Sequence, residues 1–214
     1  MSCAICHTRK PRRSCPGVHG DICTICCGTE REVTVDCPFD CPYLQEARKH
    51  ERPGPVDAGA FPNQDIRVTE EFLEEHDDLL LAAARSLLQA ANDTPGAADR
   101  DVRDALEAMI RTQRTLDSGV YYESRPDNLL ASRIFSEMRA GLEEFRNQER
   151  EELGMARTRD SDVQVILAFL QRLELDRNNG RPRSRAFLDS LRGLLSEAES
   201  NVRPGHSTSS LIVP

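Results

Sequence analysis

Eight thiols are concentrated at the N-terminal end of this 214-residue chain, all of them before residue 42. They are Cys3, Cys6, Cys15, Cys23, Cys26, Cys27, Cys37 and Cys41. Two Cys-x2-Cys pairs and one Cys-x3-Cys pair occur among them, and such spacing lets two sulfurs reach one ion. A tetrahedral ion such as Zn²⁺ takes four thiolates. The thiols therefore predict two Zn²⁺ ions in closed sites, with no open position for water or substrate.

We predict that the two sites are cross-braced, with their ligands interleaved along the chain. The first site consists of Cys3, Cys6, Cys23 and Cys26, and the second of Cys15, Cys27, Cys37 and Cys41, with His19 as an alternative ligand. The spacing Cys-x2-Cys-x8-Cys-x7-Cys-x2-Cys of the first five cysteines resembles the first part of B-box zinc fingers. This resemblance implies cross-bracing and a role in protein interaction. The chain departs from the B-box pattern at Val18 and at the closing pair Cys37 and Cys41, where that family has an acidic or Cys ligand and histidines.

Other ligand pairings and other uses of the thiols remain open at this stage. In a sequential pairing, residues 23–27, 37 and 41 form a treble-clef-like site, and His7 or His19 completes a second site with Cys3, Cys6 and Cys15. An iron-sulfur cluster fits less well, because the Cys-x2-Cys-x2-Cys run of ferredoxins is missing. The adjacent Cys26 and Cys27 also allow a redox sensor, in which oxidation expels zinc.

The elements that position the last ligands are a short strand and a helix. Residues 31–36, Arg-Glu-Val-Thr-Val-Asp, alternate as a β-ribbon arm does. After Cys41, Pro42 and good helix formers predict a helix, whose N-terminal dipole would favour the thiolates of Cys37 and Cys41. The sequence therefore predicts a small irregular two-zinc finger with a short β-ribbon.

The remainder of the chain is mainly α-helical in its pattern. Apolar residues recur at helical spacing in five segments, which begin near residues 69, 99, 124, 161 and 186 and are joined by short loops. Such helices are typical of an antiparallel bundle. We expect a cysteine-rich module over residues 1–50, a linker rich in Pro and Gly over 51–68, the bundle over 69–199, and a flexible tail over 200–214.

Composition restricts the partners of the chain. A formal net charge of -8 disfavours nucleic acid and anionic membranes as partners, since both attract Lys and Arg. Two basic runs keep nucleic-acid binding as an alternative: Arg9–Arg13, and Arg181–Arg185, whose Gly-Arg-Pro start resembles an AT-hook. A loop between two helices explains the second run equally well, and cations near thiolate sites explain the first.

The functional prediction combines these observations. No apolar run approaches the roughly 18 residues that a membrane span needs, and the N-terminus lacks a signal sequence, so we expect a cytoplasmic protein. Closely spaced cysteines in a reducing compartment bind metal more often than they form disulfides. The sequence contains no nucleophile set or phosphate loop, and we therefore expect no enzyme. We predict an intracellular structural-zinc protein that acts as an adaptor for another protein.

Overall fold

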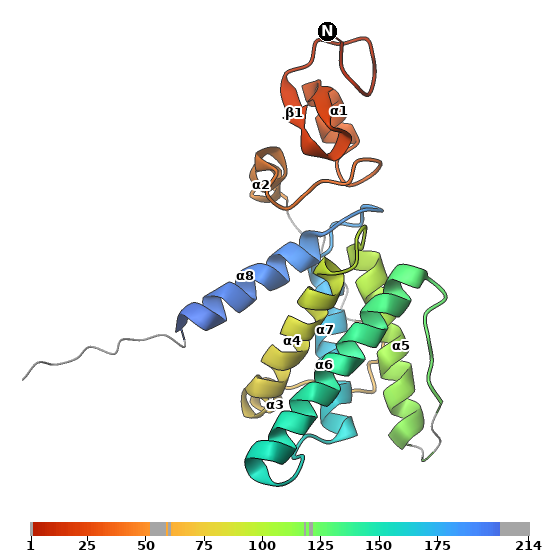
Figure 1. Cartoon of the computed structure of the whole chain (residues 1–214), viewed down its shortest axis with the longest axis vertical. Helices are drawn as coiled ribbons and strands as arrows, with labels where there is room; N and C mark the ends of the chain where they lie inside the picture. The colour runs from red at the N-terminus through yellow and green to blue at the C-terminus, as the bar shows by residue number, and fades with distance from the viewer. Residues whose placement is uncertain (1, 52–58, 60, 118, 120–121, 202–214) are drawn as a thin grey trace, which may run out of the picture.

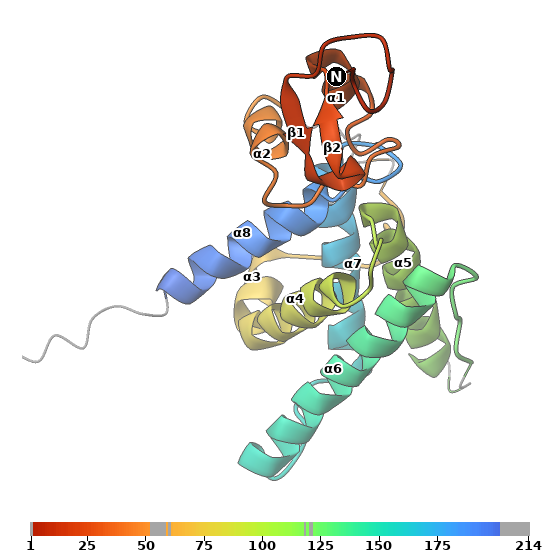
Figure 2. The ribbon, with the colours of Figure 1, turned by 45° about the horizontal axis from the view of Figure 1, so that its top comes forward.

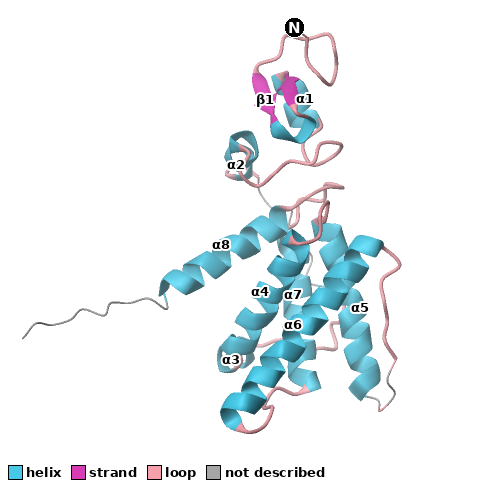
Figure 3. Cartoon of the chain, viewed as in Figure 1, coloured by secondary structure: helices cyan, strands magenta, loops and turns pink. Residues whose placement is uncertain are grey.

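The structure is a computed structural model, and it describes residues 2–51, 59, 61–117, 119 and 122–201. The described part is mainly helical, as predicted, with one small antiparallel sheet (Figure 3). Two separate hydrophobic clusters form its interior, one among residues 3–44 and one among residues 66–195. Figure 1 shows the first cluster's residues as a module at one end of a helical bundle. The predicted tail from residue 202 onward and most of the predicted linker's Pro-Gly segment lie outside the described residues.

The module is built around a two-stranded ribbon. Strand β1 (Arg13–Cys15) pairs with β2 (Gly20–Ile22), so that Cys15 lies opposite Gly20 (Figure 2). A 3-10 turn, Pro16–Val18, joins the strands, and His19 closes it in a left-handed conformation. A Cβ on Gly17 would lie 2.4 Å from the carbonyl oxygen of Asp36, so glycine lets this turn pack against the segment before Cys37.

Two short helices complete the module, and one sequence prediction is wrong. Helix α1 (Thr24–Thr29) begins after Cys23 and contains Cys26 and Cys27, and α2 (Pro42–Arg48) follows Cys41, as predicted. The predicted strand at 31–36 is instead a turn, because the N–H groups of residues 33, 34 and 35 all donate to the carbonyl of Glu30. Glu32 there has a φ of 53°, which a strand does not allow.

Six helices form the larger cluster. Their bounds are α3 (Glu70–Glu75), α4 (Asp77–Asn92), α5 (Asp99–Asp117), α6 (Leu129–Leu153), α7 (Asp160–Arg177) and α8 (Ala186–Asn201). Helix α4 packs mainly on α6, and α5 on α7, while α8 crosses the end of the bundle nearest the module (Figure 1). Helices α4 and α6 approach closely at Gly141, since a Cβ there would lie 2.4 Å from Oγ of Ser86. Each helix in the described residues is too short or too polar to cross a membrane.

Two helix boundaries differ from the sequence prediction. Thr69 caps the first helix as expected, with its Oγ1 accepting from the N–H of Phe72 at 3.2 Å, but the helix breaks at His76. The His76 ring stacks on Phe72 at 4.0 Å, and the residue's own φ and ψ of -121° and 33° leave the helical region. The helix predicted from Ser124 begins at Leu129, because a hydrogen bond from the Ser124 N–H to Thr112 ties the preceding segment to α5.

Candidate metal centre

Four cysteines that are far apart in sequence form a compact sulfur cluster at the free end of the module. The sulfurs of Cys3, Cys6, Cys23 and Cys26 all lie within 4.8 Å of one another. Four thiolates around a Zn²⁺ ion at about 2.3 Å are separated by about 3.8 Å, so little movement is needed to close this cluster on an ion. The structure thus brings together the first predicted ligand set, at a spacing that suits a metal ion.

Local backbone geometry aims hydrogen bonds at these sulfurs. The N–H of Cys23 donates to Sγ of Cys3 at 3.2 Å, and the N–H of Cys26 donates to Sγ of Cys23 at 3.4 Å. Cys23 is also the N-cap of α1, which orients the amides of the first helical turn toward its sulfur. Donors of this kind stabilise negative charge on sulfur, as metal-bound thiolates require.

The same surroundings spread the acidities of the four thiols. A hydrogen bond from the Thr8 hydroxyl, followed by backbone donors, lowers the pKa of Cys6 to about 5. Burial acts to raise the pKa of Cys3, but backbone N–H groups outweigh it and lower the pKa. Burial and then the neighbouring thiols raise the pKa of Cys26 to about 12. A cation bound among the four sulfurs would offset this negative charge and favour ionisation of Cys26.

The other four cysteines surround a second place, closer to the bundle. Cys15, Cys27, Cys37 and Cys41 line one small cavity of about 10 Å³, together with apolar side chains that include Ile22, Val35 and Leu44. Burial chiefly raises the pKa of Cys37, and the negative charges of Glu32, Cys15 and Cys41 add to the rise. Among the described residues, the group whose sulfurs lie close enough together to hold a metal ion is the first set.

The two competing ligands of the second set, Cys27 and His19, have different surroundings. Sγ of Cys27 accepts a hydrogen bond from Nη1 of Arg13 at 3.1 Å, with Nη2 of Arg31 at 4.0 Å. Cys27 also lines the cavity with Cys15, Cys37 and Cys41. His19 is exposed at the ribbon turn and does not line the cavity. The geometry therefore favours Cys27 as the fourth member of the second set.

Three arginines of the two basic runs make contacts inside the chain. Arg13 bonds to Cys27 and lies over the ring of Tyr43 at 4.5 Å. Arg181 donates from Nη1 to the carbonyl of Arg31 at 3.1 Å, and Arg185 lies over the ring of Phe39 at 4.5 Å. These side chains are occupied in the module and at its junction with the bundle.

Sequence reasoning missed a buried acidic residue that joins distant parts of the chain. Glu32 is fully buried, and the sequence predicted only that it lies in a short β-ribbon. Its carboxylate receives hydrogen bonds from Arg48, Asn179 and the N–H of Arg185. No local pattern signals this role, because two of the three donors lie about 150 residues away.

Comparisons with protein-family models, curated proteins and solved structures found no match.

Proposed function

We propose that this chain is a structural-zinc protein whose zinc module and helical bundle together serve as an adaptor for another protein. The observation that carries the proposal is the cluster of Cys3, Cys6, Cys23 and Cys26, with sulfurs within 4.8 Å. An ion bound by four protein sulfurs keeps no position for water or substrate, so its role is to stabilise a fold. A module of about 50 residues is too small to fold on hydrophobic burial alone, which supports the same role.

We extend the zinc proposal to Cys15, Cys27, Cys37 and Cys41. Their common cavity has room for about one ion, and two arginines beside Cys27 offset the negative charge of a four-thiolate site. Zinc is preferred over an iron-sulfur cluster because a cavity of this size suits a single ion. The expected content is two zinc ions per chain.

A groove between α4 and α6 supports the adaptor role. It has a volume of about 1020 Å³ and is extended by the loop that follows α6. Apolar side chains form part of its lining. The lining also contains three arginines and six acidic residues, and the acidic residues are Glu75, Asp78, Glu144, Glu149, Glu152 and Asp162. We propose that a cationic, amphipathic segment of a partner protein binds in this groove, because its charge and its apolar face would both be matched.

Contacts within the chain favour a protein partner over nucleic acid. Arg181 and Arg185 are engaged with Arg31 and Phe39 and are not free to bind phosphates without breaking those contacts. The groove is acidic and would repel a phosphate backbone. The redox-sensor alternative predicts that mild peroxide releases zinc reversibly, and that result would replace the adaptor proposal.

Metal analysis and a charge-reversal pair test the proposal. Purified wild-type chain should contain two zinc ions, and fewer than one ion or an iron-sulfur absorption band would overturn the zinc assignment.

For the groove, the double variant Glu144→Lys with Glu152→Lys should lose binding to a cationic amphipathic helical peptide, measured by titration calorimetry. The matched control, Glu143→Lys with Glu151→Lys, makes the same charge change at exposed neighbours outside the groove. Equal losses in both variants would show that only net charge matters.

A further inference from the structure

The module is attached to the bundle through Glu32. This carboxylate accepts from Nη2 of Arg48 at 2.8 Å, from Nδ2 of Asn179 at 2.9 Å and from the N–H of Arg185 at 3.0 Å. The carbonyl of Glu32 accepts from the N–H of Arg183 at 2.8 Å. Glu32 thus joins the module to the loop between α7 and α8 with both its side chain and its backbone.

Two further contacts join the same parts. Arg48, on α2, forms an ion pair with Glu32 and a second ion pair with Asp189 of α8 at 2.5 Å. The ring of Phe39 packs against the bundle core and lies under the guanidinium groups of Arg185 at 4.5 Å and Arg192 at 4.8 Å. The module therefore contacts the bundle through the side chains of Glu32, Phe39 and Arg48, in addition to the carbonyl of Arg31, which accepts from Nη1 of Arg181.

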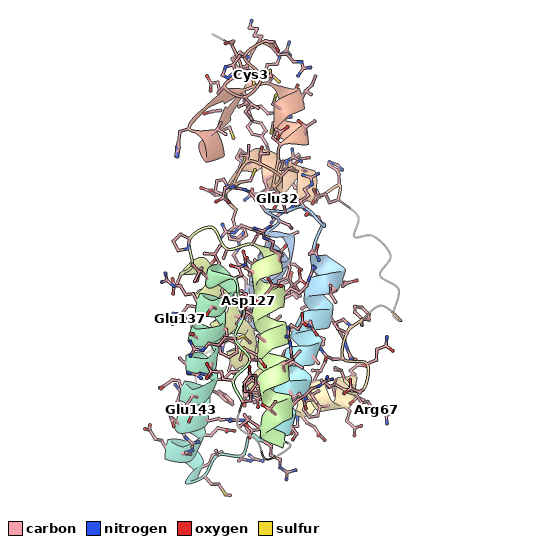
Figure 4. All side chains as sticks on the ribbon, turned by 90° about the vertical axis from the view of Figure 1, so that its right-hand side faces the viewer. Cys3, Glu32, Arg67, Asp127, Glu137 and Glu143 are labelled. Carbon is pink, nitrogen blue, oxygen red and sulfur yellow. The ribbon has the colours of Figure 1, made fainter. Side chains whose placement is uncertain are left out.

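The positions of these three residues relative to the thiols are the key observation. Glu32 lies between Cys27 and Cys37, Phe39 lies between Cys37 and Cys41, and Arg48 lies on the helix that Cys41 caps. The segments of Glu32 and Phe39 have members of the second cysteine set at both ends, and the helix of Arg48 begins at one, Cys41. Figure 4 shows Glu32 at the junction with the bundle and Cys3, of the first set, at the opposite end of the module.

We infer that Cys15, Cys27, Cys37 and Cys41 form a second zinc site that builds the surface by which the module binds the bundle, whereas the first site stabilises only the module's free end. The inference rests on the proposed zinc function and deepens it. The second ion fixes both ends of the loop that carries Glu32 and of the loop that carries Phe39. Without this ion, ordering these loops at the interface would cost more conformational entropy, and the left-handed conformation of Glu32 would add to the cost.

The experiment compares Cys15→Ser with Cys6→Ser in the full chain. Cys15 lies on the ribbon and lines the second cavity, so its substitution removes a ligand without altering the loops that reach the bundle. Two measurements are made on each variant: zinc content, and amide hydrogen exchange at Arg183 and Arg185, whose N–H groups donate to Glu32. Both variants should hold one zinc ion. Exchange at these two amides should accelerate by about tenfold or more in Cys15→Ser and stay at the wild-type rate in Cys6→Ser.

Each other result overturns a specific part of the inference. If the wild-type chain holds a single zinc ion, and Cys6→Ser loses this ion while Cys15→Ser keeps it, the second site does not exist. The proposed function would then still stand. Wild-type chain without zinc would overturn the proposed function itself. Equal exchange rates in the two variants would show that the second site does not build the interface. Loss of both ions from Cys15→Ser would show that the two sites are not independent.

Discussion

Replacing Glu32 by glutamine should weaken the junction between the module and the bundle while preserving shape. Glutamine retains one oxygen acceptor and turns the other oxygen of the wild-type carboxylate into an N–H donor. Directing the remaining oxygen at Arg48 and at the N–H of Arg185 would place the new amide donor against Nδ2 of Asn179. One hydrogen bond is therefore lost, and two donors face each other in a buried position.

The size of the effect follows from these contacts. Breaking a fully buried ion pair costs about 3–5 kcal/mol, but Arg48 keeps its second partner, Asp189, which reduces this loss. One lost hydrogen bond and one unpaired buried donor together cost about 2–4 kcal/mol. These contributions overlap, and we expect a total of about 3 kcal/mol. At about 1.4 kcal/mol per factor of ten, this equals a roughly 100-fold shift in the equilibrium between attached and detached module.

Amide exchange at Arg183 and Arg185 measures that equilibrium directly, and urea denaturation measures the accompanying loss of stability. Glu46→Gln is the matched control, because it removes one carboxylate from the same module at an exposed pair with Lys49. Such surface pairs contribute about 0–1 kcal/mol, so the control should exchange at the wild-type rate. A Glu32→Gln variant within about 0.5 kcal/mol of wild type, with unchanged exchange, would refute the role assigned to the buried carboxylate.

Three further perturbations test the packing and the electrostatics. Removing zinc with a chelator should disorder the module but leave most of the helical circular dichroism, because the two hydrophobic clusters are separate. Loss of the helical signal together with the module would contradict this separation. Gly141→Ala should lower the melting temperature through its clash with Ser86, whereas Gly193→Ala, with no atom within 4 Å of its Cβ, should raise stability by up to about 1 kcal/mol. Burial raises the pKa of Asp99, although the carboxylate accepts hydrogen bonds from Ser184 and from the first turn of α8. Because the folded chain binds this proton more tightly than the unfolded chain, the contribution of Asp99 to stability is largest below about pH 4 and declines as the pH rises. Asn at position 99 does not titrate, so the unfolding free energy of Asp99→Asn should rise relative to that of the wild type between pH 4 and 7. A difference between the two that does not change with pH would refute the raised pKa of Asp99.

Helices were predictable because their signals are local. Periodic apolar residues, the N-cap Thr69 and the left-handed Gly180 each act within a few residues of their own position. The start of α6 was misplaced because a hydrogen bond from the N–H of Ser124 to Thr112 of α5 overrides the capping pattern at Ser124. The break at His76 likewise depends on how its ring packs against Phe72, which residue types alone do not specify.

The sequence by itself indicated a metal module at the N-terminal end, because thiols at knuckle spacing are typical of metal ligands. It also predicted the first cysteine set, since two Cys-x2-Cys pairs are the simplest way to bring four sulfurs together, and these four sulfurs do lie within 4.8 Å of one another. Only the tertiary structure decided what the segments between the thiols do. Glu32 is a buried anchor because its donors come from α2 and from the loop before α8, and contacts between residues so distant in sequence leave no local pattern.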